Sequence, residues 1–306
     1  MSPFSKTSLC ETSVSLRVVV ILLALLSILS RPPAASARTV LPAAGGSAAF
    51  QSLPEIEAAF RLMYELRFSE ARTRIAAWQK LHPDDSFGYA AFAATYLFEE
   101  LYQQGVFTSA FFLDDKKFLE GIEGRPDPAR GQAFMDAIHR AQDLAGKRLA
   151  ADANDPESLF VLTLASGMLS NYTSLIEKRH LAALKFVREA EAYSARLLAV
   201  QPDMLDAYVA LGTANYIIGS LPSYKQFFLR IGGIKGDRAR GISQLEQTVS
   251  GGHYLRPFAK IMLALVLLRE KQPQRARLLL TELSSEFPSN PLYRKELDLL
   301  TPKILR

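Results

Sequence analysis

Apolar residues recur at intervals of three and four along most of the chain from Pro54 onward. Ile56, Phe60, Met63 and Tyr64, for example, fall on one side of a helix, and this spacing is typical of an amphipathic α-helix. No run of alternating apolar and polar residues lies between turn signals, as a half-buried strand requires. The pattern therefore predicts an all-α protein with roughly ten helices, some of them elongated.

One phrase recurs along the chain: a small residue in an amphipathic stretch, followed by a proline about twelve residues later. The copies are Ala71 with Pro83, Ala145 with Pro156, Ala190 with Pro202, and Ala276 with Pro288. The small residue lets two helices approach closely, and the proline ends a helix because it has no N–H and clashes with the preceding turn. The recurrence predicts a stack of helical hairpins.

Two stretches carry the phrase most completely, Pro257–Asn290 and Pro54–Pro83. The first has Leu263-Ala264 in one helix, Ala276 in the next and Pro288 at its end. Both stretches resemble the tetratricopeptide repeat, a helical hairpin of about 34 residues. The resemblance implies a right-handed solenoid of such hairpins over residues 53–306, with elongated helices in the middle.

A narrower resemblance covers residues 210–290 and is carried by Leu221-Pro222, Leu229–Gly233 and Gly236–Gly241. These phrases are similar to a family of tetratricopeptide proteins that includes fungal inclusion-body-clearance proteins and secreted bacterial relatives. That family implies a scaffold role without catalytic residues. Ser250–Gly252 is also similar to the periplasmic tetratricopeptide partners of certain substrate-binding-protein-dependent transporters, which implies an apolar ligand.

Residues 1–37 have the order of an export signal. Lys6 and Arg17 precede an apolar run from Val18 to Leu29, and Ala35–Ala37 follows as a cleavage motif. The run is shorter than the roughly 20 residues that a membrane-spanning helix needs. We therefore expect cleavage after this motif, a flexible linker over residues 38–52, and a periplasmic or secreted protein. The alternative is an uncleaved signal that anchors the chain in the inner membrane as its only membrane contact.

Charge and cysteine content exclude several classes of function. The chain has 36 Lys and Arg against 31 Asp and Glu, a net charge of +5. No block of like charges stands out, so no nucleic-acid partner is expected. The single cysteine, Cys10, precedes the apolar run, which leaves the mature chain without disulfides or a thiol nucleophile.

His139 is the best metal candidate, because Asp136 and Asp143 lie on the same helical face. A metal site would still need a ligand from another helix, and carboxylates at these offsets are usually ordinary helix-surface partners. No nucleophile and base stand together in the sequence. We therefore expect no enzyme activity, no metal and no cofactor.

The glycine-rich stretch Gly232–Arg238 invites a phosphate-loop interpretation. Its spacing fits neither the Walker pattern nor the dinucleotide fingerprint, and Asp237 is predicted to be a helix N-cap instead. The preceding segment has Phe227, Phe228 and Ile231 on one helical face. We expect this face to pack back on the stack.

The candidate binding site is the inner face of the hairpins, which their first helices line. The register follows from Ala59, Gly167, Gly212 and Ala264, which we expect at close helix contacts. The side chains placed on the inner face are Phe60, Met63, Tyr64, Met168, Asn171, Tyr172, Tyr208, Tyr216 and Ile217. Such a groove would bind a peptide helix or a lipid-like ligand. Alternatively, the long helices bend the solenoid until this face becomes core.

The sequence thus favours a non-enzymatic scaffold or adaptor that binds a protein partner in the periplasm or cell envelope. The alternative is a carrier of an apolar small molecule or lipid, held between the long middle helices.

Overall fold

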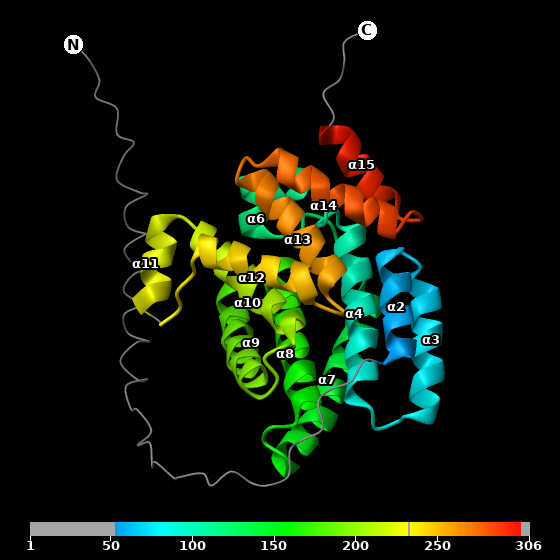
Figure 1. Ribbon diagram of the computed structural model, residues 1–306. Coiled ribbons are helices and arrows are strands. Elements are labelled where there is room, and N and C mark those ends of the chain that lie inside the picture. Colours follow the sequence, from blue (N-terminus) through cyan, green and yellow to red (C-terminus); the bar gives the residue numbers. More distant parts are fainter. Residues whose placement is uncertain (1–52, 232, 301–306) are drawn as a thin grey trace, which may run out of the picture. The chain divides into compact units, whose positions relative to one another are not determined.

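The computed structural model describes residues 53–231 and 233–300, and these residues form helices and connecting loops without a strand (Figure 1). The predicted all-α class is confirmed for them. The predicted export signal and linker lie outside the described residues. The α-helices are α2 (Pro54–Tyr64), α3 (Phe68–Leu81), α4 (Ser86–Gln103), α5 (Ser109–Phe112), α6 (Asp115–Glu120), α7 (Pro128–Ala151), α8 (Pro156–Asn171), α9 (His180–Val200), α10 (Tyr208–Ser220), α11 (Ser223–Ile231), α12 (Arg238–Gly251), α13 (Arg256–Arg269), α14 (Pro273–Glu286) and α15 (Pro291–Leu300).

The described residues hold more helices than the periodicity predicts, because short helices occupy connections. Helices α5 and α6 lie between α4 and α7, and α11 lies between α10 and α12. Helix α8 continues into a π-helical turn, Tyr172–Ile176, and a 3-10 turn, Leu205–Ala207, precedes α10. Helices α5 and α6 and the two turns contain too few residues to show a helical period.

Aspartate side chains begin several of the helices. Asp237 accepts a hydrogen bond from the N–H of Arg240 at 3.0 Å, so the predicted N-cap of α12 is confirmed. Asp85 caps α4, Asp127 caps α7 and Asp155 caps α8 in the same way. Each carboxylate satisfies N–H groups that the first helical turn leaves unpaired, at the end where the helix dipole favours negative charge.

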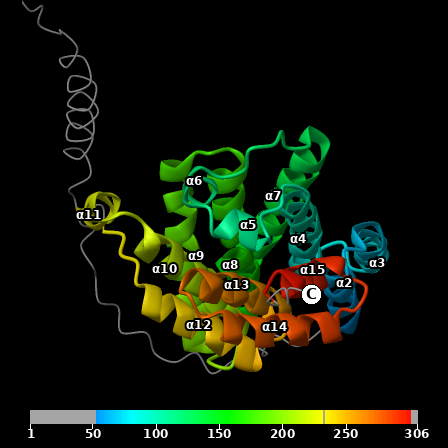
Figure 2. The same ribbon diagram turned by 90° about the horizontal axis from the view of Figure 1, so that it is seen from above.

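The long helices pack as pairs in chain order: α2 with α3, α4 with α7, α8 with α9, α10 with α12, and α13 with α14. The second helix of each pair also contacts the first helix of the next pair, and α14 contacts α15. Figures 1 and 2 show this succession of neighbouring helices. Each helix therefore buries its apolar stripe mainly against helices close to it in the sequence.

Two glycines set the approach of α10 to α12. A Cβ on Gly212 would lie 2.9 Å from the carbonyl oxygen of Gly241, and a Cβ on Gly241 would lie 2.7 Å from the carbonyl oxygen of Gly212. The close contact predicted at Gly212 is thus confirmed. Gly167 differs, because the nearest atom to its added Cβ is the Cβ of Ala210 at an ordinary 3.7 Å.

An aromatic cluster joins helices from opposite ends of the described chain. The ring of Tyr254, just before α13, lies 5.6 Å from Phe60, 4.8 Å from Phe87 and 6.2 Å from Phe160 between ring centres. The hydroxyl of Tyr64 donates a hydrogen bond to the Tyr254 carbonyl at 3.0 Å. Residues from α2, α4 and α8 therefore share one core with the segment that leads into α13.

Asp206 fixes the position of that segment. Its side chain is only 2% exposed and accepts hydrogen bonds from the N–H groups of His253, Tyr254 and Leu255. Burial raises the pKa of Asp206, and the three N–H donors act in the opposite direction. Through Asp206 the turn before α10 holds the start of α13 in place.

Among the described residues, one stretch is long and apolar enough to cross a membrane, Pro156–Ile176. More than half of its window, 56%, is buried inside the fold. Its apolarity is accounted for by its central position, since α8 packs against α4, α7, α9 and α10.

Candidate functional site

Four of the side chains predicted to line an inner groove belong to the core. Phe60, Met63 and Tyr64 are 4%, 3% and 1% exposed, and Tyr216 is 1% exposed. The expectation of an open groove is corrected for these four. For the three residues of α2 the physical reason is the aromatic cluster described above, because Tyr254 and its neighbours cover the face that α2 would otherwise present. Tyr216 is covered instead by the close approach of Gly241 on α12, and its hydroxyl donates a hydrogen bond to Glu270.

The other five predicted residues, Met168, Asn171, Tyr172, Tyr208 and Ile217, are half-buried. Met168, Tyr172 and Ile217 pack against the main core, and the ring of Tyr172 stacks on another aromatic side chain of that core, at 4.8 Å. Each of the five side chains therefore keeps only a limited exposed area.

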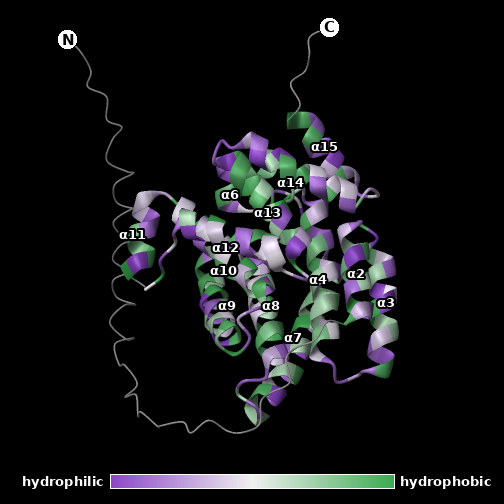
Figure 3. Cartoon of the chain, viewed as in Figure 1, coloured by the Kyte–Doolittle hydropathy of each residue, from purple (hydrophilic) through white to green (hydrophobic). Residues whose placement is uncertain are grey.

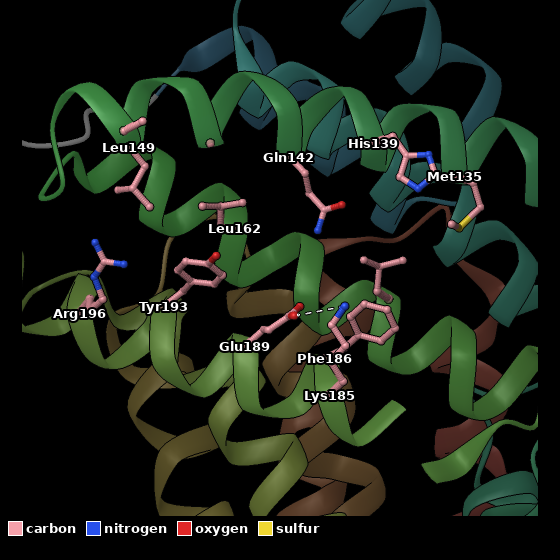
Figure 4. Close-up of a pocket in the computed structure, with 13 residues that line it drawn as sticks. Met135, His139, Gln142, Leu149, Leu162, Lys185, Phe186, Glu189, Tyr193 and Arg196 are labelled. Atoms are coloured by element: carbon pink, nitrogen blue, oxygen red, sulfur yellow. Dashed lines mark ion pairs between the residues drawn. The ribbon is translucent and has the colours of Figure 1, made fainter. Parts of the chain in front are cut away.

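A groove lies elsewhere, between α7 and α9, and α8 forms its floor (Figure 4). Its volume is about 750 Å³. Helix α7 contributes Met135, His139, Gln142, Gly146, Leu149 and Ala150, helix α8 contributes Leu162 and Leu169, and helix α9 contributes Lys185, Phe186, Glu189, Tyr193 and Arg196. The sequence indicates this region only through the alternative function, a carrier that holds its ligand between the long middle helices.

The groove forms because α7 and α9 both pack on α8, which lies between them. The lining of the groove extends from Met135 to Ala150 on α7 and from Lys185 to Arg196 on α9, which is about 22 Å and about 17 Å of helix at the usual rise per residue. Small residues on α7 leave the space open: a Cβ added to Gly146 would meet no atom within 4 Å. A large side chain at this position would fill part of the groove between α7 and α9.

The groove has an apolar floor and charged rims. Leu162 and Leu169 are buried at its base, and Phe186 and Tyr193 are half-buried on the α9 wall. Along the rim, Lys185 lies 3.7 Å from the carboxylate of Glu189 and 5.5 Å from the ring centre of Phe186. An apolar floor with charges at the edges is the lining of a binding site for an amphipathic molecule.

The two carboxylates near His139 in sequence are engaged by other side chains. The Asp143 carboxylate lies 2.8 Å from Lys147 and 3.6 Å from Arg140, and Lys147 lowers the pKa of Asp143 through its hydrogen bond. Asp136 accepts a hydrogen bond from Gln132. Over residues 53–231 and 233–300, no group of three or more His, Asp or Glu side chains converges.

The structure brings together one serine and histidine that the sequence did not suggest. The Oγ of Ser174, in the π-helical turn, lies 3.2 Å from Nδ1 of His180. Partial burial, together with the nearby Lys225 and Lys178, lowers the pKa of His180. A catalytic pair needs a third group that orients the base. In a serine hydrolase that third group is usually a carboxylate, whereas the charged neighbours that shift the pKa of His180 are cations.

No model of a known protein family matches the chain, and no curated protein matches it either. The resemblance to tetratricopeptide proteins therefore rests on the residues quoted above.

Proposed function

We propose that the protein is a non-enzymatic adaptor of the cell envelope, whose groove between α7 and α9 holds an amphipathic segment of a protein partner. The observation that carries the proposal is the groove itself, with Leu162 and Leu169 at its floor and Lys185, Glu189 and Arg196 along its rim. Helix-in-groove recognition needs this combination of an apolar base and polar edges.

The proposed fold is a right-handed solenoid of tetratricopeptide-like hairpins. Its support is the succession of helix pairs, each second helix touching the next first helix, together with the recurring Ala and Pro positions. In this arrangement α7 and α9 are the second helices of consecutive hairpins, and α8 is the first helix between them. The groove then lies on the outer side of the stack, while the inner side is the aromatic core.

A peptide helix suits the groove better than a small apolar molecule does. A concave pocket usually buries about 70–90% of the surface of a bound small molecule. Of the groove's side chains, only Leu162 and Leu169 are buried in the free protein, and His139, Lys185 and Arg196 are exposed. A long groove with an exposed rim matches the length and the two faces of a helix.

The proposed location outside the cytoplasm follows from the signal-like order of residues 1–37. A partner in the same compartment would then be a secreted or envelope protein. A chain that keeps its signal would carry out the same binding while attached to the inner membrane.

Two substitutions test the groove. Phe186→Ser and Tyr193→Ser should each weaken partner binding by about 2 kcal/mol, or roughly thirtyfold in Kd, which is the effect of losing an aromatic anchor. Leu278→Ser, at an exposed leucine of α14, is the matched control and should bind like the parent. The affinity is measured with the purified partner after co-purification from the envelope. Equal affinity in all four proteins would contradict the proposal.

The second candidate is a carrier of an apolar molecule in the same groove. Met135, Leu149 and Phe186 favour it, because they supply apolar wall on both sides. Native mass spectrometry of the protein purified from the envelope decides between the two. A bound lipid mass that disappears in Phe186→Ser supports the carrier, and a bound polypeptide supports the adaptor.

A further inference from the structure

Helix α11 exposes a row of large apolar side chains. Tyr224, Phe227, Phe228 and Ile231 are 63%, 60%, 47% and 52% exposed, and their spacing places them on one helical face. The expected packing of this face against the stack is therefore wrong. The other helices leave α11 at the periphery, as Figures 1 and 2 both show, with apolar and polar residues side by side along it (Figure 3).

Hydrogen bonds and a close backbone approach hold the base of this helix. The side-chain amide of Gln226 donates hydrogen bonds to the carbonyl oxygens of Gly219 at 3.0 Å and Leu221 at 2.8 Å. In the segment that follows α11, a Cβ on Gly236 would overlap the backbone nitrogen of Gly219. These contacts hold the residues before and after α11 close together, and α11 projects outward from them.

The stretch of chain that contains the exposed face is rich in basic residues. Between Ser220 and Gly241 the basic residues are Lys225, Arg230, Lys235, Arg238 and Arg240, and the single acidic residue is Asp237. Five basic residues against one acidic residue give this stretch a net charge of +4, and one of the five, Arg238, lies 3.4 Å from the carboxylate of Glu270. The Asp237 carboxylate is itself engaged in capping α12.

We infer that α11 docks on a lipid surface that carries anionic headgroups. Aromatic and aliphatic side chains on one face, with lysine and arginine beside them, are the composition of helices that lie in the membrane interface. The basic residues supply attraction to anionic lipid within a Debye length, and the apolar face enters the boundary of the acyl chains. A second copy of this chain is disfavoured as the occupant, because Lys225 and Arg230 of one copy would meet the same two cations of the other.

The inference concerns a different surface from the groove of the proposed function. Contact of α11 with a bilayer would bring the protein to a membrane surface, where an envelope partner resides. Nine residues make a small anchor, so the contact is weak and reversible on its own.

A local fluorescence probe tests the inference in the full chain. Phe228→Trp places a tryptophan on the exposed face, Leu278→Trp places one on α14, and the parent reports Trp78, its single tryptophan. Vesicles of brominated phosphatidylcholine are compared with vesicles that also contain brominated phosphatidylglycerol. We expect quenching and a blue shift for Phe228→Trp with phosphatidylglycerol, and no added quenching for the other two proteins. Because the probe is local, contact made by residues 18–29 does not change its signal.

Reversing two charges measures how much the basic residues contribute to vesicle binding. In the Phe228→Trp protein, Lys225→Glu with Arg230→Glu should weaken vesicle binding by more than about tenfold, since each basic residue near an anionic surface adds a several-fold attraction. Phe186→Ser, in the groove, should bind vesicles like the parent, so failure here and failure of the proposed function are distinguishable. Absence of quenching at position 228, or equal quenching on both lipids, would overturn the inference. So would a dimer, measured by light scattering, that Phe227→Ser abolishes.

Discussion

Single residues decide how closely the helices approach. Gly212 and Gly241 face each other where α10 crosses α12, and each backbone occupies the space that a side chain on the other would need. Gly167, assigned to an equivalent position by the repeat register, has ordinary space around it. A sequence pattern identifies the small residue but not the distance of the opposing helix, so the two glycines look alike until the crossing is known.

Alanine at these two glycines should have opposite effects. Gly212→Ala overpacks the crossing and should lower the free energy of unfolding by about 1–3 kcal/mol. Gly167→Ala relieves the entropic cost of a glycine inside α8 and should raise it by about 0.5–1 kcal/mol. Urea unfolding of both variants and the parent measures the difference. Equal shifts of the same sign would show that α10 and α12 do not cross at Gly212.

The boundaries of each helix depend on residues adjacent in sequence, whereas the face that it buries does not. The N-cap at Asp237 and the proline-ended hairpins follow from the chemistry of a few adjacent residues. Whether a face is covered depends on segments far away in sequence. Tyr64 is covered because Tyr254 and Asn290 bond to its hydroxyl and carbonyl groups. Phe228 is exposed because it lies on α11, which projects from the stack where Gly219 and Gly236 approach each other.

Two phenylalanines test this distinction between a covered and an uncovered helix face. Phe60→Ala removes a ring from the core of α2 and should cost about 3–5 kcal/mol. Phe228→Ala alters an exposed position on α11 and should change the free energy of unfolding by less than about 0.5 kcal/mol. Thermal or urea melts of both variants supply the comparison. A large loss for Phe228→Ala would place α11 back against the stack.

The groove could be predicted only in part. The long helical periods of residues 131–152 and 180–200 indicate two extended helices. Their separation by α8 is a property of the packing, as is the open space beside Gly146. A sequence pattern identifies an apolar stripe on a helix but not what the stripe faces. The stripe of α9 that includes Phe186 and Tyr193 has the same spacing whether it packs on another helix or lines a groove.

For the molecule as a whole, hydrogen bonds between distant residues unite the described helices. Asn290 donates to the Tyr64 carbonyl at 2.8 Å, and the backbone N–H of Leu53 donates to the Tyr254 hydroxyl at 2.7 Å. Near α5, the guanidinium of Arg269 donates to the carbonyl of Phe112 at 2.9 Å. These contacts connect α2 and α5 to the last helices of the described chain, which favours one cooperative unfolding transition over fraying from an end.

Buried tyrosines should make this unit sensitive to alkali. Burial raises the pKa of Tyr64 and Tyr293, and burial together with a hydrogen bond to Glu270 raises the pKa of Tyr216 to about 12 from 10. The folded state thus holds these protons more tightly than the unfolded state does. Its stabilisation is complete below pH 10 and is lost as the pH rises toward 12 and beyond.

The measurement is the free energy of unfolding in urea across that pH range. Tyr216→Phe should flatten the alkaline decline relative to the parent, while Tyr224→Phe, at an exposed tyrosine of α11, is the matched substitution and should leave the decline unchanged. A parent whose stability does not fall between pH 10 and pH 12 would contradict burial of these hydroxyls.

We propose that binding occurs in the groove of α7, α8 and α9, and not on the inner face that the repeat pattern indicates. Photo-cross-linking with benzoylphenylalanine tests it most directly, at Phe186 in the groove, at Ile217 on the predicted inner face, and at Leu278 as an outer control. We predict a partner adduct at position 186 alone, mapped by mass spectrometry to one amphipathic segment. Adducts at position 217 with none at 186 would contradict the account.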